Sequence, residues 1–398
     1  MKIDASTPLV KKKIVVIGGG IHGVSLAYYL TKTYASQVDV TVIEKTKIAA
    51  AASGKAGGFL ARDWGSGPTS QLHKVSYELH KTLASTLGVS SYREVTTLNV
   101  QRSRKKVKSP ASWLNINTVS GELMDKNTAQ VTPLELTEKM MEAAIASGAK
   151  LRIDSAIGVH LNENGAVASV DLGSGASIAT DQLAICLGPW SGVMVEDWFN
   201  LPLPMEGVKS TSLVYDNLAE VKQEPFALFC GEDENGCHLE LYPRVNGELY
   251  ICGCGGSDYV SGDRLRADGD CESADKVHQD PARVQAAARS FETITQFTSL
   301  NGQKPVPAIQ QACMRPCMPD ALPVMGKVPG VEGAYISCGH NCWGILWGPV
   351  SGLSMAELMM EGRSRSVDLS SFDPSRYMSQ SAGKRGRKKG LSEVGEQW

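Results

Sequence analysis

The chain has 398 residues, which is enough for two domains with substantial cores. An apolar content of 42%, a charged content of 21% and a net charge of −2 are ordinary for a globular protein, and they predict no general attraction to nucleic acid or to anionic membranes. No stretch approaches the ~20 apolar residues that span a bilayer, and the first residues contain no apolar secretory signal, so we expect a cytoplasmic protein.

The first structured part of the chain has the pattern of a dinucleotide site. Residues 14–17 form a short apolar run, which predicts a β-strand, and three glycines with the spacing G-x-G-x-x-G follow it. An amphipathic helix is predicted from about residue 24, and a second strand at 40–43 ends in Glu44. This order is typical of proteins that bind an adenine dinucleotide. The acid after the second strand argues against a 2′-phosphate and so against NADP, whereas NAD and FAD both fit.

Each glycine of this turn has its own expected role. Gly18 permits the tight turn, Gly20 lets the backbone approach a pyrophosphate, and Gly23 allows the helix to pack closely on the strand. The N-terminus of the helix would offer N–H groups and a partial positive charge to the diphosphate. Glu44 would accept hydrogen bonds from ribose hydroxyls. His22, inside the turn, is expected to be a packing residue or a pyrophosphate neighbour rather than a base.

The rest of the chain alternates predicted helices with strand-rich stretches. A loop of small residues follows the second strand at 49–61. Helical spacing of apolar residues is found at 71–88, 131–148 and 279–302, while 205–260 is rich in strand-like runs with turn residues. A dinucleotide motif therefore opens the chain and strand-rich material occupies its middle.

The ten cysteines are expected to be reduced thiols, because no export signal precedes them. Cys230, Cys237, Cys252 and Cys254 lie close together in the sequence, but their spacing fits no compact zinc site, so no metal is expected. On a single strand, Cys252 and Cys254 would share one face.

Three further segments decide between NAD and FAD. They are LAICLGPWS at 183–191, CMRPCMPDALPVMG at 313–326 and GHNCWGILWGPVSG at 339–352. Together with the N-terminal motif they resemble the FAD-dependent D-amino-acid oxidase superfamily, which includes glycine oxidase and monomeric sarcosine oxidase. The resemblance covers the chain from about 12 to 365. ASGKAGGFLA at 52–61 looks most like a eukaryotic subgroup of poorly characterised members, some of which are discussed as trafficking or assembly factors.

The resemblance implies an α/β fold. We expect a Rossmann-like FAD-binding domain of the glutathione-reductase type, with an inserted α+β substrate domain built mainly on an antiparallel sheet. The predicted bounds are 12–75, 130–204 and 311–375 for the discontinuous FAD-binding domain, and 76–129 and 205–310 for the substrate or cap domain. The polar segment 379–398 is predicted to be a disordered basic tail, whose KRGRKK run has the composition of a nuclear-import or polyanion-binding patch.

The resemblance also implies a set of FAD-binding residues. Gly344, Gly348 and Gly352 are expected to let the backbone lie against the flavin ring. Pro349 is expected to begin the last helix, whose N–H groups would face the carbonyl edge of the ring. The candidate cofactor-binding residues are Gly18, Gly20, Ile21, His22, Gly23, Glu44, Lys45, Ser53, Gly54, Gly57, Gly58, Gly188, Trp190, Cys313, Gly339, Trp343, Gly344 and Ile345.

Arg315 and His340 are the candidate catalytic residues. Arg315 falls where members similar to glycine oxidase carry the arginine that grips the substrate carboxylate, and a planar guanidinium can hold a carboxylate with two hydrogen bonds. A structural ion pair is the alternative for Arg315. His340 is expected to tune the flavin or relay protons, or else to be a structural histidine. Lys55 and Arg62, which flank the small-residue loop, are weaker candidates for substrate contacts.

Cys313 raises the question of a covalent flavin. It lies two residues before Arg315, the offset at which members similar to sarcosine oxidase have their flavin-linked cysteine. A thiolate there could attack the 8-methyl group of the flavin. That group, however, has a tyrosine where this chain has Arg315. A non-covalent FAD beside a buried thiol is therefore favoured, and a covalent link at Cys313 is the alternative.

The resemblance implies an FAD-dependent oxidoreductase that acts on C–N bonds. A small amine or (N-methyl) amino acid would pass a hydride from Cα to flavin N5, the imine would be hydrolysed, and O₂ or another acceptor would reoxidise the flavin. The alternative is an FAD-containing trafficking or assembly factor with little turnover, which acts through protein partners. An NAD-dependent dehydrogenase would leave 313–352 unexplained. No nucleic-acid partner is expected, and the basic tail would allow access to the nucleus.

Overall fold

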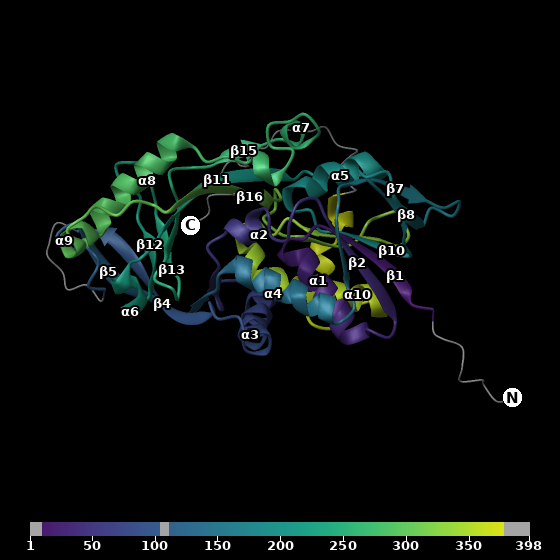
Figure 1. Cartoon of the computed structure of the whole chain (residues 1–398), viewed down its shortest axis with the longest axis horizontal. Coiled ribbons are helices and arrows are strands. Elements are labelled where there is room, and N and C mark those ends of the chain that lie inside the picture. The colour runs from purple at the N-terminus through teal and green to yellow at the C-terminus, as the bar shows by residue number, and fades with distance from the viewer. Residues whose placement is uncertain (1–9, 104–110, 378–398) are drawn as a thin grey trace.

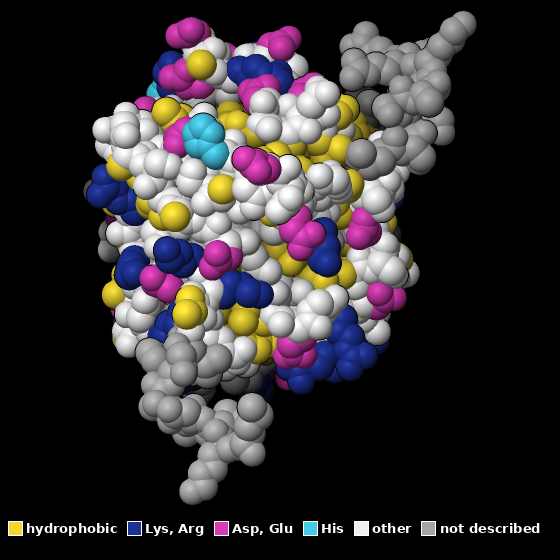
Figure 2. Space-filling view, turned by 90° about the vertical axis from the view of Figure 1, so that its right-hand side faces the viewer, with side chains coloured by type: hydrophobic (Ala, Val, Ile, Leu, Met, Phe, Trp, Pro, Cys, Tyr) yellow, Lys and Arg dark blue, Asp and Glu magenta, His cyan; other side chains and the backbone are white. Residues whose placement is uncertain are grey.

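The computed structural model describes residues 10–103 and 111–377, which form two large sheets and the helices packed on them (Figure 1). The predicted tail at 379–398 lies outside the described residues. None of the described helices is long and apolar enough to cross a bilayer. On the face shown in Figure 2, acidic and basic side chains are interspersed rather than gathered into a patch of one sign.

The first sheet has six strands in the order β17–β18–β10–β1–β2–β6. Neighbouring strands pair parallel, except that β17 runs antiparallel to β18. Buried, continuous apolar runs such as the one in β1 suit a parallel sheet that is covered on both faces. The bounds are β1 (Lys12–Ile17), β2 (Val38–Glu44), β6 (Lys150–Ile153), β10 (Gln182–Ile185), β17 (Val324–Lys327) and β18 (Ala334–Cys338).

Different elements cover the two faces of this sheet. On β1, Ile14 and Val16 pack with the helices, whereas Val15 and Ile17 pack with the three-stranded sheet and α5. The helices are α1 (Ile21–Tyr34), α4 (Pro133–Ala146) and α10 (Gly344–Glu361), with α3 (Thr69–Leu87) packed on α10. The opposite face carries β7 (Ala156–Leu161), β8 (Val167–Leu172), β9 (Ser177–Ala179) and α5 (Ser191–Phe199).

The second sheet has nine strands and lies beside the first (Figure 1). Its strands pair mainly antiparallel, and β4 pairs parallel with β12. Helix α8 (Pro281–Ile294) covers its outer face and α9 (Phe297–Asn301) follows. The bounds are β3 (Phe59–Ala61), β4 (Arg93–Arg102), β5 (Val119–Gln130), β11 (Glu206–Tyr215), β12 (Phe226–Cys230), β13 (Glu240–Pro243), β14 (Leu249–Cys252), β15 (Asp258–Val260) and β16 (Ile309–Cys317), with the short helices α2 (Ala52–Lys55), α6 (Ala219–Gln223) and α7 (Gly262–Leu265) between them.

The predicted fold class is confirmed, since a Rossmann-like parallel sheet stands beside a mainly antiparallel α+β part. Some strands and one helix do not pack with the domain to which their residues are predicted to belong. β3 and β16 belong to the second sheet, and α3 packs on α10 beside the first. The division of the chain into domains remains a prediction.

Several local expectations are corrected by the structure. α1 begins at Ile21 rather than near residue 24, because the turn ends at Gly20. The helix predicted at 279–302 is divided between α8 and α9, and the N–H of Gln296 at the break donates to the Trp113 carbonyl at 2.9 Å.

Cys252 and Cys254 do not share a strand face, which corrects another expectation. β14 ends at Cys252, and Gly253 then takes a left-handed φ of +72°. As a result, Cys252 packs on the inner side of the sheet, while Cys254 joins the core beneath α8. All ten cysteines are free thiols. The described residues contain no cluster of three His, Cys, Asp or Glu side chains able to hold a metal ion.

Two glycines of the last helix pack against α1 instead of the flavin. An added Cβ at Gly348 would lie 2.5 Å from Ile21 Cγ1, and one at Gly352 would lie 2.4 Å from Ser25 Cβ. These residues let the two helices approach closely. The expectation that Gly348 and Gly352 lie against the ring is therefore wrong.

Pro349 lies inside α10, which begins at Gly344, so the expectation that this proline starts the helix is also wrong. A proline has no N–H, and the carbonyl of Ile345 therefore loses its usual helical partner. The buried His80 of α3 replaces it, since its Nε2 lies 3.0 Å from the Ile345 oxygen and 3.2 Å from the Leu346 oxygen. Burial lowers the pKa of His80 to about 4, so the ring is neutral and Nε2–H donates.

We expect His80→Ala to destabilise the protein by about 1–3 kcal/mol, because it leaves buried carbonyls of α10 without a donor. Denaturant unfolding of the purified variant measures this. The control is His278→Ala, whose exposed side chain forms no hydrogen bond or ion pair within residues 10–103 and 111–377, and its expected change is within ~0.5 kcal/mol. Equal stabilities of the two variants would show that His80 contributes nothing to α10.

Candidate functional site

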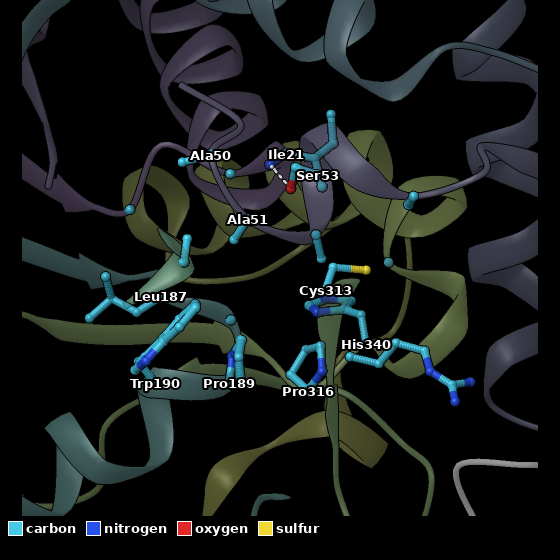
Figure 3. A pocket seen from close by; sticks show the side chains of 18 of the residues that line it. Ile21, Ala50, Ala51, Ser53, Leu187, Pro189, Trp190, Cys313, Pro316 and His340 are labelled. Carbon is cyan, nitrogen blue, oxygen red and sulfur yellow. Dashed lines mark hydrogen bonds between the residues drawn. The ribbon is translucent and has the colours of Figure 1, made fainter. Parts of the chain in front are cut away.

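A cavity of about 850 Å³ is lined by both large sheets (Figure 3). Its volume lies within the ~300–1,000 Å³ range that is usual for ligand pockets. One part follows the carboxyl ends of β1, β2 and β10, where open α/β sheets bind their ligands. The other part is formed by the inner face of the second sheet, on strands β11 to β14 and β16.

The glycine turn between β1 and α1 lines the first part of the cavity. Gly18 has a φ of +110°, and an added Cβ would lie 2.4 Å from the Cys186 carbonyl oxygen. Gly20, the N-cap of α1, has no side-chain cap, and the N–H of Ile21 donates to Ser53 Oγ at 2.9 Å (Figure 3). An added Cβ at Gly23 would lie 2.1 Å from the Gly18 carbonyl oxygen, so this glycine provides the close packing that its spacing predicts.

Glu44 ends β2 and lines the same part of the cavity. Its Oε2 accepts the N–H of Gly19 at 2.8 Å, and its Oε1 accepts the N–H of Thr46 at 3.0 Å. The carboxylate therefore braces the glycine turn. Two carboxylate oxygens have about four acceptor sites, so capacity remains for the ribose contact, which stays a prediction.

The structure brings most of the candidate residues to this cavity. Three are exceptions, because Gly23, Gly54 and Gly339 do not line it and serve close packing instead. An added Cβ at Gly54 would lie 2.2 Å from the Ala49 oxygen, and one at Gly339 would lie 2.8 Å from Met318 Cγ. The candidates that line the cavity are Gly18, Gly20, Ile21, His22, Glu44, Lys45, Ser53, Gly57, Gly58, Gly188, Trp190, Cys313, Arg315, His340, Trp343, Gly344 and Ile345.

His22 and His340 are stacked on each other, with ring centroids 3.6 Å apart and planes 20° apart. Nε2 of His340 lies 3.0 Å from Ser351 Oγ, and both Nδ1 atoms are buried without a partner among the described residues. Burial lowers the pKa of His22 to about 3 and lowers that of His340 well below its usual value. Both rings are therefore neutral near pH 7, which favours a positioning role over proton relay.

Arg315 on β16 lines the second part of the cavity. Its Nη2 donates to Ser210 Oγ and Ser257 Oγ at 3.3 Å each, and its Nε is buried without a partner. Within the described ranges no carboxylate lies at ion-pair distance from this guanidinium, which argues against the structural ion pair. Burial lowers the pKa of Arg315, but nearby thiols and the more distant carboxylate of Glu240 raise it, so the guanidinium stays charged and an anionic ligand at contact distance would stabilise it further.

Cys313 also lines the cavity (Figure 3). Burial is the largest effect on its thiol and raises its pKa, although Arg315 and Lys55 act in the opposite direction. The thiol form is less nucleophilic than the thiolate, so this environment favours a non-covalent flavin. The covalent link remains the alternative.

The two weaker candidates for substrate contacts lie outside the lining of the cavity. Nζ of Lys55 donates to the carbonyls of Ala274 and Ala312 at 3.5 and 3.2 Å, which ties α2 to the second sheet. Arg62 forms surface ion pairs with Asp63 and Glu78 at 3.1 Å each.

An aromatic wall with one carboxylate was not predicted from the sequence. The ring of Tyr242 stacks on Phe59 at 5.1 Å and on Tyr250 at 6.0 Å, and Phe229 lies against the same group. Glu240 lines the cavity beside them. A signal was available in the alternating residues of HLELYP, since the polar and aromatic positions of that run share one face of a strand.

The comparisons with known proteins agree with this geometry. The family model described as "FAD dependent oxidoreductase" matches residues 13–358. A putative oxidoreductase of Schizosaccharomyces pombe is 28% identical, over 91% of this chain and 98% of its own. Two solved structures show the same fold at 20% identity: L-proline dehydrogenase from P. horikoshii (TM-score 0.74; 93% of this chain, 99% of that chain) and glycine oxidase from Geobacillus kaustophilus (TM-score 0.72; 92% and 99%).

Proposed function

Because the chain belongs to the family of FAD dependent oxidoreductases, we propose that it oxidises the C–N bond of a small amine or (N-methyl) amino acid. The observation that carries the proposal is the guanidinium of Arg315, which lines the same cavity as the glycine turn, has no carboxylate at ion-pair distance among the described residues, and has a buried Nε without a partner there. The names of related structures, glycine oxidase and L-proline dehydrogenase, support an amino acid as substrate.

The residues of the cavity fit FAD. Gly18 and Gly20 have no side chains, and an added Cβ would lie 2.4 Å from the Cys186 oxygen or 3.0 Å from Ser53 Oγ, so the backbone of the turn stays open to a diphosphate. Glu44 lies at the end of β2, where it would bind a ribose. Gly344 and Ile345, at the N-terminus of α10, line the cavity as well. When bound, FAD supplies the acceptor for the hydride that leaves the substrate.

The chain's own residues would bind and orient the substrate. Arg315 would hold a carboxylate, and the serines that hydrogen-bond to Nη2 fix the direction of its guanidinium. The aromatic wall around Tyr242 would exclude water from the reacting amine. The stacked neutral histidines would support the N-terminus of α10, whose partial positive charge stabilises a nearby negative charge.

The visible spectrum of the purified protein tests this proposal. Under anaerobic conditions, we expect a panel of amino acids and N-methyl amino acids to contain at least one member that bleaches the oxidised flavin band, and air to restore the band if O₂ is the acceptor. A flavin band that no member of the panel bleaches would favour the alternative, an FAD-containing trafficking or assembly factor with little turnover.

A further inference from the structure

Glu240 is held on the inner face of the second sheet by the alternation of β13. Leu241 packs on the outer side beneath α8, while Tyr242 belongs to the inner aromatic group and Glu240 lines the cavity with it. Cys252 of β14 is the cross-strand partner of Glu240. The strand register therefore fixes a carboxylate in the wall of the cavity.

Within the described residues, the carboxylate of Glu240 has hydrogen-bond donors but no cation at ion-pair distance. Its Oε2 accepts from the hydroxyl of Tyr242 and from Cys252 Sγ, the latter at 3.4 Å. Among residues 10–103 and 111–377, no donor reaches Oε1, and no lysine, arginine or histidine lies at ion-pair distance from the carboxylate, although Arg315 acts on it at longer range. A partly buried carboxylate of this kind is stabilised by a cation that enters with the ligand.

The same cavity also holds the guanidinium of Arg315, and within the described residues the two charges interact at longer range without forming an ion pair. Each is fixed by its own neighbours, since two serine hydroxyls hold Arg315, while Tyr242 and Cys252 hold Glu240. Opposite charges that are kept apart in one cavity complement a ligand that carries both a carboxylate and a cation.

An α-amino acid offers two positions for that cation, and the chemistry distinguishes them. The amine that is oxidised must be neutral, because its lone pair forms the C=N bond as the hydride leaves Cα. A carboxylate beside that amine would favour its protonated form and oppose the reaction. A cation on the side chain does not react, so its pairing with Glu240 is compatible with turnover.

We propose that the cavity selects an amino acid with a cationic side chain, whose carboxylate binds Arg315 and whose side-chain ammonium or guanidinium binds Glu240. The rings of Tyr242 and Tyr250 would cover the alkyl stem and face the cation. The inference rests on the proposed function, because it names the substrate class of the same site.

The sharpest test compares lysine with norleucine, in both enantiomers, since norleucine has the same carbon chain with a hydrogen in place of the side-chain ammonium. The measured quantity is the second-order rate constant for anaerobic bleaching of the flavin in the holoprotein. We expect lysine to be preferred by about tenfold or more, and Glu240→Gln to lower the rate for lysine by about 10- to 100-fold while norleucine changes little. The control is Glu232→Gln, which removes an exposed charge outside the cavity and should behave as the wild type.

The outcomes separate this inference from the proposed function. If wild-type protein oxidises norleucine as fast as lysine, or if Glu240→Gln slows both substrates equally, Glu240 does not bind a side-chain cation. The amino-acid oxidase function would still stand. If no amino acid bleaches the flavin, both proposals fail together. The wild-type comparison needs no variant, so it decides the question even where Glu240→Gln is recovered without flavin.

Discussion

Replacing Arg315 by leucine is expected to lower kcat/KM for the amino-acid substrate by about 10²- to 10³-fold. The loss of one member of a buried charge pair costs about 2–5 kcal/mol, and each 1.4 kcal/mol is about tenfold. The purified variant is expected to keep its flavin, because Arg315 lies on a strand of the second sheet, whereas the glycine turn that would hold the diphosphate belongs to the first sheet. Anaerobic bleaching rates and the flavin absorbance per protein measure the two effects separately.

Arg62→Leu is the matched control, since it removes an arginine that pairs with Asp63 and Glu78 on the surface and should leave both readouts unchanged. Unchanged kinetics in Arg315→Leu would assign this arginine a structural role. Loss of flavin from that variant would instead place it in the binding of the cofactor.

The parts of the fold that depend on short stretches of sequence were predictable. The strand, glycine turn, helix, second strand and Glu44 each have a local signal, and close contacts such as that of Gly23 with the Gly18 carbonyl follow from their spacing. The resemblance of three more segments pointed to FAD and to Arg315. The sequence also predicts that the strand-rich stretch 205–260 belongs to the substrate domain, but this stretch contains no motif, so the specificity of the pocket cannot be read from it.

The features that could not be predicted from the sequence depend on contacts between distant segments or on a single backbone angle. The left-handed φ of Gly253 ends β14 and separates Cys252 from Cys254. The stack of His22 on His340 joins the two ends of the nucleotide-binding part, and neither residue carries a local signal for the other. These features required the strand register and the helix packing to be known.

Gly23→Ala is expected to weaken the binding of FAD by at least ~tenfold, because the added methyl group cannot fit between α1 and β1. An added Cβ would lie 2.1 Å from the Gly18 carbonyl oxygen and 3.2 Å from Val16 Cγ1. The backbone must move to relieve such overpacking, at a cost of about 1–3 kcal/mol or more, and the backbone concerned is the turn that would face the diphosphate. Flavin absorbance per protein and the midpoint of thermal unfolding measure the two effects.

Gly158→Ala is the matched control for this variant. Its added Cβ would lie 3.7 Å from Asp171 Oδ2, an ordinary contact, and Gly158 itself does not line the cavity, although the first two residues of β7 do. It should therefore retain its flavin and unfold near the wild-type temperature. If Gly23→Ala did the same, the turn would be able to shift without losing its hold on the diphosphate, and the close approach at Gly23 would matter for packing alone. If Gly23→Ala keeps its thermal midpoint but loses flavin, the close approach of α1 to β1 is required for binding FAD rather than for stability.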